Sequence, residues 1–256
     1  MNGLLSDLTW VEAKEMFKSG STVIIPVGSN EQHGPHMPVN CDSFFVTSVV
    51  TQVAKKLEGK VPVYYTPTIW TGFSPHHRDF PGTITLRLET LLSLVYDICD
   101  SLIYHNVRRI MIINGHGGNA IPLRAAGSKI GDELGNAPFV LSYWDVLGSD
   151  WESLIKERPA GIGHAGESET SLRLFLAPET IRKEELERAD FIANDVQPER
   201  SAIYQFQRWQ NITYKGYTGY PKWGTAEKGK QIYETIIERL CELIHSDYRK
   251  WMEMKE

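Results

Sequence analysis

The stretch TVIIPVGSNEQHGPH spans residues 22–36 and joins an apolar run to a cluster of polar side chains. The β-branched run at residues 22–27 predicts a buried strand. Glu31 and His33 follow it and, being two residues apart, point the same way in an extended loop. Asp42 then opens the next predicted helix, as a cap or as a ligand. Because open α/β sheets gather their sites at the carboxyl ends of strands, this segment predicts a functional site there.

Apolar β-branched runs alternate with amphipathic segments along much of the remaining chain. Further strands are predicted at residues 61–65, 109–113 and 139–142, and helices at residues 42–57, 88–102, 121–134 and 232–251. Strands separated by helices run mostly parallel, and their crossover helices cover both faces of the sheet. The expected fold is therefore α/β, a three-layer α/β/α sandwich with a mostly parallel central sheet.

The chain has 256 residues without an internal repeat or a linker, so residues 1–256 are expected to form a single domain. Residues 195–223 are poor in periodicity and are interpreted as a long excursion on the sheet. Seven aromatic residues between Tyr204 and Trp223 offer the alternative of a stacking platform for single-stranded nucleic acid. The net charge of −5 argues against that alternative, so no nucleic-acid partner is expected.

The cysteines and the apolar runs indicate where the protein works. Only three cysteines are present, and their scattered positions predict no disulfide framework, which favours a reducing, cytoplasmic location. The first residues lack the pattern of a signal peptide, and no run reaches the roughly 20 apolar residues of a spanning helix. We therefore expect no membrane partner and a small polar or neutral substrate.

A second polar cluster, NGHGGN at residues 114–119, follows the predicted strand at residues 109–113 and places His116 among glycines. Glycines let the backbone approach a bound ion closely, although such turns also arise for steric reasons alone. The segment lacks the lysine of a GxxxxGK[ST] loop and the GxGxxG spacing, which disfavours a nucleotide loop. Its place after a strand matches that of the first cluster.

A third cluster, HAGESETS, occupies residues 164–171. If a helix has already begun, His164 and Glu167 share one face, and Glu169 points elsewhere. An acidic helix start favoured by the helix dipole is the ordinary alternative for this segment in isolation. A role for this segment in a chemical site is indicated only when it is considered together with the other two clusters.

The five residues of these clusters that are counted as ligands supply three carboxylates and two imidazoles without a thiolate. This inventory fits two divalent ions that share one bridging carboxylate, with zinc, manganese or iron favoured. Such a pair lowers the pKa of a bridging water and polarises a carbonyl, which indicates hydrolysis. The predicted metal ligands are Glu31, His33, Asp42, His116 and Glu167.

These segments resemble motifs of the creatininase, or creatinine amidohydrolase, family. The matching segments occur in the family's order: EQHGPH at residues 31–36, Asp42, FPGT at residues 80–83, NGHGGN, HAGESETS and GTAEKG at residues 224–229. The resemblance covers most of the chain and implies an α/β/α fold and a binuclear metal centre. It also implies a ring-shaped homohexamer in many members.

The resemblance also assigns roles within the centre. Glu31, Asp42 and His116 would hold one ion, while His33, Asp42 and Glu167 would hold the other. His164 would be the catalytic proton shuttle, beside Glu167, because an imidazole titrates near neutrality. Orientation of a metal ligand is the alternative role for His164.

One departure from creatininase proper concerns the ligands. That enzyme has a metal-binding glutamate shortly after the histidine of this loop, where the present chain has Gly118. Glu167 stands where the same enzyme has an apolar residue, and its carboxylate could fill the vacancy. This combination is typical of the NGHGGN branch of the family.

A second departure concerns the substrate pocket. Trp144 aligns with one of two tryptophans that line the substrate site of creatininase, but Ala160 replaces the other, which makes creatinine a poor substrate. His76 is expected near the mouth of the pocket. The residues expected to contact the substrate are His36, His77, Trp144, Gly117 and Gly118.

The predicted function is a binuclear-metal amidohydrolase that cleaves a non-peptide C–N bond, in a cyclic amide or a formamide, through a metal-bridging water. The NGHGGN branch includes deformylases of pyrimidine intermediates, so a formamidopyrimidine nucleotide is one candidate substrate. A small-peptide hydrolase is the alternative, because the same chemistry cleaves peptide bonds. A catalytically inactive relative is a third possibility, which the complete ligand set disfavours.

Overall fold

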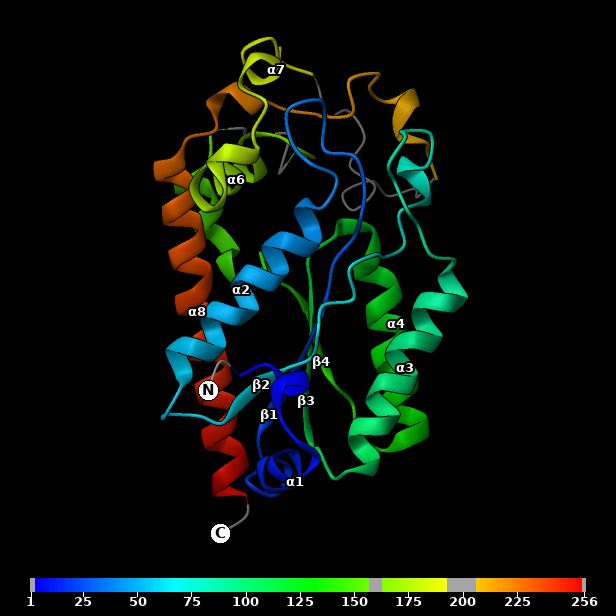
Figure 1. The fold of residues 1–256 in the computed structure, drawn as a ribbon, viewed down its shortest axis with the longest axis vertical. Coiled ribbons are helices and arrows are strands. Elements are labelled where there is room, and N and C mark those ends of the chain that lie inside the picture. Colours follow the sequence, from blue (N-terminus) through cyan, green and yellow to red (C-terminus); the bar gives the residue numbers. More distant parts are fainter. Residues whose placement is uncertain (1–2, 157–162, 193–205, 255–256) are drawn as a thin grey trace.

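A computed structural model describes residues 3–156, 163–192 and 206–254. Residues 195–205 of the predicted excursion and Ala160 lie outside these ranges. The central sheet has the strand order β2-β1-β3-β4 with every neighbouring pair parallel (Figure 1). Its strands are β1 (Thr22–Val27), β2 (Val63–Tyr65), β3 (Arg109–Asn114) and β4 (Phe139–Ser142). The predicted parallel sheet is therefore confirmed, with β2 shorter than expected.

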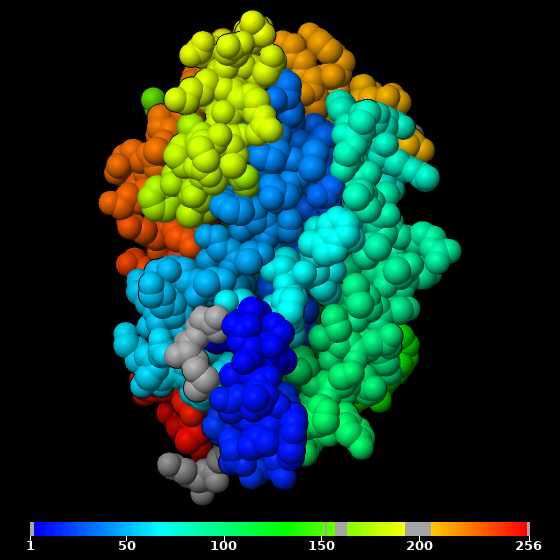
Figure 2. Space-filling model, viewed as in Figure 1, coloured from blue at the N-terminus to red at the C-terminus, as the bar shows by residue number. Residues whose placement is uncertain are grey.

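Helices cover both faces of this sheet (Figure 1). The α-helices are α1 (Trp10–Lys18), α2 (Cys41–Leu57), α3 (Leu88–Tyr104), α4 (Ala120–Leu134), α5 (Trp151–Leu154), α6 (Glu167–Leu176), α7 (Lys183–Glu187) and α8 (Ala226–Glu253). Short 3-10 helices are η1 (Leu5–Asp7), η2 (Pro75–His77), η3 (Gly117–Asn119), η4 (Asp145–Asp150), η5 (Pro178–Thr180), η6 (Trp209–Asn211) and η7 (Pro221–Trp223). The space-filling view shows α1, α2 and α3 forming much of one face (Figure 2).

The alternation of side chains along β1 divides the core into two layers. Ile24 belongs to the apolar cluster that includes residues of α2, α6 and α8. Val23 and Ile25 point to the other face and join a cluster with residues of α1, α3 and α4. Successive residues of a strand face opposite sides, so a strand buried on both sides is apolar throughout. These two cores confirm the predicted α/β/α fold.

The register of the strands brings their carboxyl ends together. Val27 pairs with Asn114, and Asn114 pairs with Ser142, so β1, β3 and β4 end at the same level. The loops that follow these strands gather at the upper end of Figure 1. This alignment is what allows residues from distant clusters to meet.

Two features bear on the environment of the protein. None of the helices within residues 3–156, 163–192 and 206–254 combines the length and apolar character needed to cross a bilayer. Cys41, Cys99 and Cys241 are buried free thiols. The structure thus agrees with the absence of a disulfide framework in the sequence.

The packing of α8 against α6 depends on a glycine. The apolar stripe of α8 is buried as predicted, and Thr225 caps the helix by accepting a hydrogen bond from Lys228 N (3.2 Å). At the first turn, a Cβ added to Gly229 would overlap the carbonyl oxygen of Ser171 in α6. Gly229 therefore sets the distance between the two helices.

We predict that Gly229→Ala destabilises the protein by about 1–3 kcal/mol, the usual cost of overpacking. Without the contact between the helices, alanine would stabilise α8 relative to glycine by about 1 kcal/mol. A loss of stability in Gly229→Ala would therefore show that α6 and α8 are too close at this position to admit a methyl group. Urea unfolding would measure the change, with the exposed neighbour Lys230→Ala as the control. Equal or greater stability of Gly229→Ala would contradict this account of the packing.

Candidate metal centre

The centre forms where the loops after β1 and β3 meet the start of α2. Glu31 and His33 come from the first loop, His116 from the second, and Asp42 from the first turn of α2. Asn114 shapes the second loop: its amide nitrogen donates to the His116 carbonyl (2.7 Å), and its amide oxygen accepts from His116 N (3.0 Å). A side chain at the strand end therefore fixes the histidine that follows.

Asp42 lies at the middle of the centre. Its Oδ2 is 3.0 Å from His116 Nδ1, and its Oδ1 is 3.1 Å from His33 Nε2. Glu31 Oε2 is 3.1 Å from the same His116 nitrogen. These four side chains are buried, each with at most 4% of its surface exposed. One carboxylate therefore presents separate oxygens to two imidazoles.

The outer nitrogen of each imidazole is engaged by a second partner. His33 Nδ1 is 3.0 Å from the Glu31 carbonyl, which can only accept, so Nδ1 carries the proton in this bond. His116 Nε2 is 3.1 Å from the Ser74 hydroxyl. Ligand histidines are commonly oriented in this way, with one nitrogen hydrogen-bonded and the other free for a metal.

Burial makes the charges of the centre strongly interdependent. Burial alone would lower the pKa of His116, but Glu31 and Asp42 raise it to about 10. Burial likewise opposes the charged form of His33, and Asp42 raises its pKa to about 10. Burial would raise the pKa of Glu31, yet His116 and His77 hold it well below its ordinary value. The buried carboxylates therefore require nearby positive charge.

The donor set fits divalent cations. Among the described residues, Glu31 Oε1 and Asp42 Oδ2 are buried oxygens whose contacts with imidazole nitrogens lack hydrogen-bond geometry. One donor atom from each of Glu31, His33 and Asp42 lies within 4.8 Å of the other two. Carboxylate oxygens and imidazole nitrogens without thiolate suit zinc, manganese or iron.

The structure places the Glu167 carboxylate against α8. Its fully buried carboxylate pairs with the Lys228 ammonium group and accepts a hydrogen bond from Lys156 N (2.8 Å). The helix begins only at Glu167, so His164 precedes it and the two do not share a helical face. Between them Ala165 adopts a left-handed conformation with φ 52°. The condition for His164 and Glu167 to share a helical face is therefore not met, and Glu167 faces α8.

Glu169, which was expected to point elsewhere, faces the centre. Its Oε2 is 3.8 Å from His33 Nε2, and its carboxylate accepts a hydrogen bond from Ala165 N. Burial, with a contribution from Asp42, outweighs the attraction of His33 and raises its pKa to about 7. His33, His164 and Glu169 offer three further donor atoms within 4.8 Å of one another. Glu169 is therefore the carboxylate of this segment that lies beside His33.

Two histidines form the next layer around Glu31. His164 Nδ1 is 3.8 Å from Glu31 Oε1, and His77 Nε2 is 3.3 Å from the same oxygen. His164 Nε2 lies 2.8 Å from the Gln32 carbonyl and 3.0 Å from the Gln32 amide nitrogen, and the shorter contact favours donation to the carbonyl. Burial, with repulsion from His33, lowers the pKa of His164 to about 3. Its imidazole is therefore neutral, with Nδ1 as the acceptor that faces the centre.

Gln32 orients this layer, a role that its sequence position did not reveal. Gly34 N donates to its amide oxygen (2.9 Å), which fixes the orientation of the amide. Its amide nitrogen then lies 2.9 Å from His77 Nδ1, which accepts. The only available signal was its place between Glu31 and His33.

The residues expected to contact a substrate fall into different places. His77 lies beside the centre, as described above. His36 is fully buried and hydrogen-bonds to Thr170 Oγ1 (3.0 Å), so it exposes no surface to a substrate. Trp144 is partly buried against the apolar core, and its ring packs edge-on against Tyr143 (4.9 Å between centroids). Trp144, which was expected to contact the substrate, thus packs against the apolar core.

The two glycines of the second loop also differ. Gly117 is exposed, and a Cβ there would meet no atom within 4 Å. At Gly118 a Cβ would lie 2.6 Å from the Phe73 carbonyl oxygen and 2.7 Å from the His76 ring. Gly118 therefore allows His76 to stack on His116, with 5.5 Å between their ring centroids and 8° between their planes.

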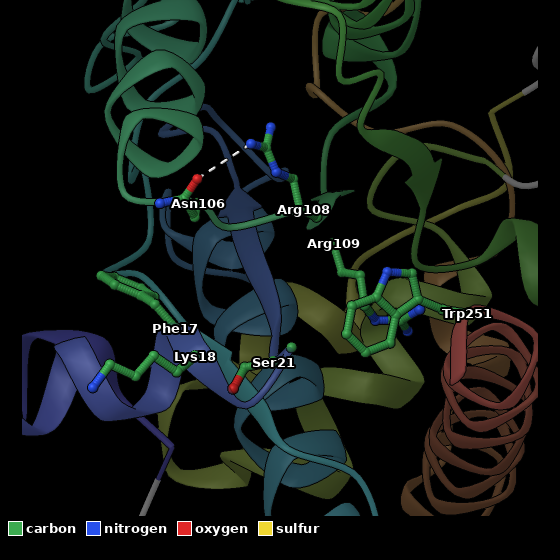
Figure 3. A pocket seen from close by; sticks show the side chains of 8 residues that line it. Phe17, Lys18, Ser21, Asn106, Arg108, Arg109 and Trp251 are labelled. Atoms are coloured by element: carbon green, nitrogen blue, oxygen red, sulfur yellow. Dashed lines mark hydrogen bonds between the residues drawn. The ribbon is translucent and has the colours of Figure 1, made fainter. Parts of the chain in front are cut away.

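A separate pocket of about 290 Å³ lies at the opposite end of the sheet (Figure 3). It is lined by Ser21, which precedes β1, and by Arg109, which begins β3. The Arg109 guanidinium pairs with Asp247 (2.6 Å) and lies over the ring of Trp251. The Arg109 guanidinium therefore stabilises the end of α8. The candidate catalytic groups lie at the other edge of the sheet.

An α/β/α fold with buried carboxylates and imidazoles at the carboxyl edge of its sheet defines a class, the metallohydrolases. A sequence model of the creatininase family, described as creatinine amidohydrolase, matches residues 6–244. The chain therefore belongs to the creatininase family and is a metal-dependent amidohydrolase.

Individual relatives agree with this assignment over nearly their whole length. Creatinine amidohydrolase of Pseudomonas putida is 30% identical over 95% of this chain and 96% of its own. The mycofactocin precursor peptide peptidase of Mycobacterium ulcerans (strain Agy99) is 28% identical, with coverages of 92% and 89%. A solved Zn-Zn form of a creatininase variant has a TM-score of 0.83 and 28% identity over 96% of this chain and 98% of its own.

We predict that Lys228→Met destabilises the protein by about 3–5 kcal/mol, because it removes the Lys228 ammonium group from the buried Glu167 carboxylate. Adding Glu167→Gln should restore most of the loss. Chemical unfolding would measure both variants. Lys18→Met is the control, because Lys18 and Glu15 form an exposed pair worth at most about 1 kcal/mol. A loss as small as that of the control would show that the buried pair does not hold α6 to α8.

Proposed function

We propose that the protein uses two divalent ions to hydrolyse a non-peptide C–N bond of a small amide. Glu31, Asp42 and His116 would hold one ion, and His33, Asp42 and Glu169 the other. The observation that carries this proposal is the position of Asp42, whose two oxygens face different imidazoles at 3.0 and 3.1 Å. A carboxylate in this position can bridge two ions, whereas a single-ion site needs only one of its oxygens.

When bound, two such ions would lower the pKa of a water and polarise the amide carbonyl. The protein's own contribution is the handling of the proton. His164 Nε2 is committed to the Gln32 carbonyl (2.8 Å), so Nδ1, which faces Glu31, is the nitrogen that can accept a proton. It would then give this proton to the departing nitrogen. His77, held by Gln32, would orient the Glu31 carboxylate.

The proposed substrate is a cyclic amide or a formamide, and a formamidopyrimidine nucleotide is the specific candidate. Hydrolysis of a formamide adds water across the C–N bond and releases formate and an amine. Peptide hydrolysis is the second candidate, supported by the relatives named as peptidases. The two candidates share the metal chemistry and differ in what surrounds it.

Several wider properties belong to the same proposal. The proposed ions are zinc, manganese or iron. A related creatininase variant has been solved in a Zn-Zn form, which supports zinc as one candidate here. The free cysteines support a reducing, cytoplasmic location. The homohexamer follows from the family resemblance alone. The single domain over residues 1–256 is supported by one shared sheet and by the family match over residues 6–244.

Glu169→Gln and Glu167→Gln form a matched pair that tests the ligand assignment. Glu169→Gln should reduce the bound zinc from two ions to about one per chain and lower activity by more than about 100-fold, since even outer partners of ligands cost 10–100-fold. Glu167→Gln should keep both ions and lose stability. Elemental analysis after gel filtration would give the stoichiometry. Loss of an ion only in Glu167→Gln would instead support Glu167 as the ligand of the second ion.

The proposed reaction can be tested with a panel of amides and each metal. Zinc-loaded or manganese-loaded protein should release formate from a formamidopyrimidine nucleotide and spare short peptides and creatinine. A chelator should abolish the reaction, and added metal should restore it. Cleavage of the peptides with the nucleotide left intact would favour the peptidase alternative. No metal-dependent cleavage of any amide would contradict the proposed function.

A further inference from the structure

The centre has one partly exposed edge among the described residues that form it. The side chains of Glu31, Asp42 and His116 are at most 4% exposed, whereas His164 is 13% and Glu169 is 17% exposed. His164 and Glu169 therefore mark a partly exposed border of the centre, and His76, stacked on His116, is partly exposed as well. Side chains that border this edge can select what enters.

Trp209 borders this edge from a distant part of the sequence. Its indole is 5.1 Å from the His164 ring, in an edge-on arrangement, and 5.0 Å from the His77 ring, measured between centroids. The ring of His76 lies 6.3 Å away. Each of these histidines also neighbours Glu31 or His116, so the indole is one layer removed from the proposed ions.

The segment that carries Trp209 is fastened to the loops of the centre. Arg208, its neighbour, forms an ion pair with Asp79 (3.0 Å) in the loop that also carries His76 and His77. The indole Nε1 donates to the Gly216 carbonyl (3.3 Å). Gly216 has φ 76°, and a Cβ there would overlap the Gln32 side chain. Trp209 is thus held at a defined place, and its polar edge is already satisfied.

An ordinary core role does not describe this tryptophan well. Trp209 is only half-buried, and the ring contacts it makes among the described residues are with imidazoles. A half-buried indole with its N–H occupied offers its flat hydrocarbon surface to whatever lies beside it. Aromatic surfaces favour planar π-systems through stacked or edge-on contacts.

We propose that Trp209 is a specificity-determining residue, which forms an aromatic wall at the mouth of the site and selects substrates with a planar ring beside the scissile amide. The proposal rests on the proposed function for the location of that amide. It assigns to the segment at residues 206–216 the role that the sequence had suggested for Trp144. The ring preferred by this wall is aromatic or otherwise flat, rather than puckered.

The test compares the binding of benzamide and cyclohexanecarboxamide to the zinc-loaded protein by isothermal titration calorimetry. The two amides share the carboxamide group and differ in the planarity of the ring. The wild type should bind benzamide more tightly. Trp209→Leu, which keeps an apolar side chain, should reduce this preference by about 2- to 12-fold, the range expected for one aromatic pair. Trp209→Phe should keep most of it.

Trp223→Phe is the matched control, because Trp223 stacks on Tyr220 at 3.7 Å between centroids and lies outside the proposed wall. It should leave the preference unchanged. An unchanged preference in Trp209→Leu, or a wild type that binds neither amide or binds both equally, would overturn the proposal. The ratio of the two affinities is measured without turnover. Failure of this binding test can therefore be distinguished from failure of the proposed hydrolysis in the amide panel.

Discussion

Buried negative charge is the constraint on which this site depends. Glu31 and Asp42 are almost entirely removed from water, and a carboxylate in such surroundings needs cations or hydrogen-bond donors close by. The protein meets this need with imidazoles on both sides of Asp42, and the divalent ions of the family would meet it with greater charge. Metal affinity and folding are therefore coupled here, because the groups that bind the ions are costly to bury without them.

The sheet provides the rigidity that such a cluster requires. Because β1 and β3 end at the same level, short loops are enough to bring Glu31, His33 and His116 into contact. Asn119 reinforces this arrangement by donating to the Gly28 carbonyl (3.0 Å) and accepting from Phe73 N (2.8 Å). Three loops are thereby joined by one side chain, which limits the freedom of the ligands they carry.

The fold and the first candidate ligands were accessible from the sequence because local pattern determines where the strands end. The apolar strands predicted the sheet, and residues that directly follow β1 and β3 could be expected to meet. Glu167 and Glu169 could not be distinguished in this way, since the choice depends on where α6 starts and on Lys228 reaching back from α8. The position of Gln32 and the role proposed for Trp209 depend on contacts across large sequence separations, which no local pattern records.

Gly118 carries a consequence for how members of this family can diverge. The parallel stacking of His76 on His116 occupies the space that a side chain at position 118 would need. The resemblance implies a glutamate ligand after this histidine in creatininase proper, so with Glu169 as the proposed ligand here, conversion between the two arrangements would involve the 118 loop, position 169 and the histidine at 76 together. A single substitution would give a crowded loop with a surplus carboxylate. On the proposed ligand assignment, each branch would tend to retain its own ligand set, because the crowding at position 118 makes the separate changes depend on one another.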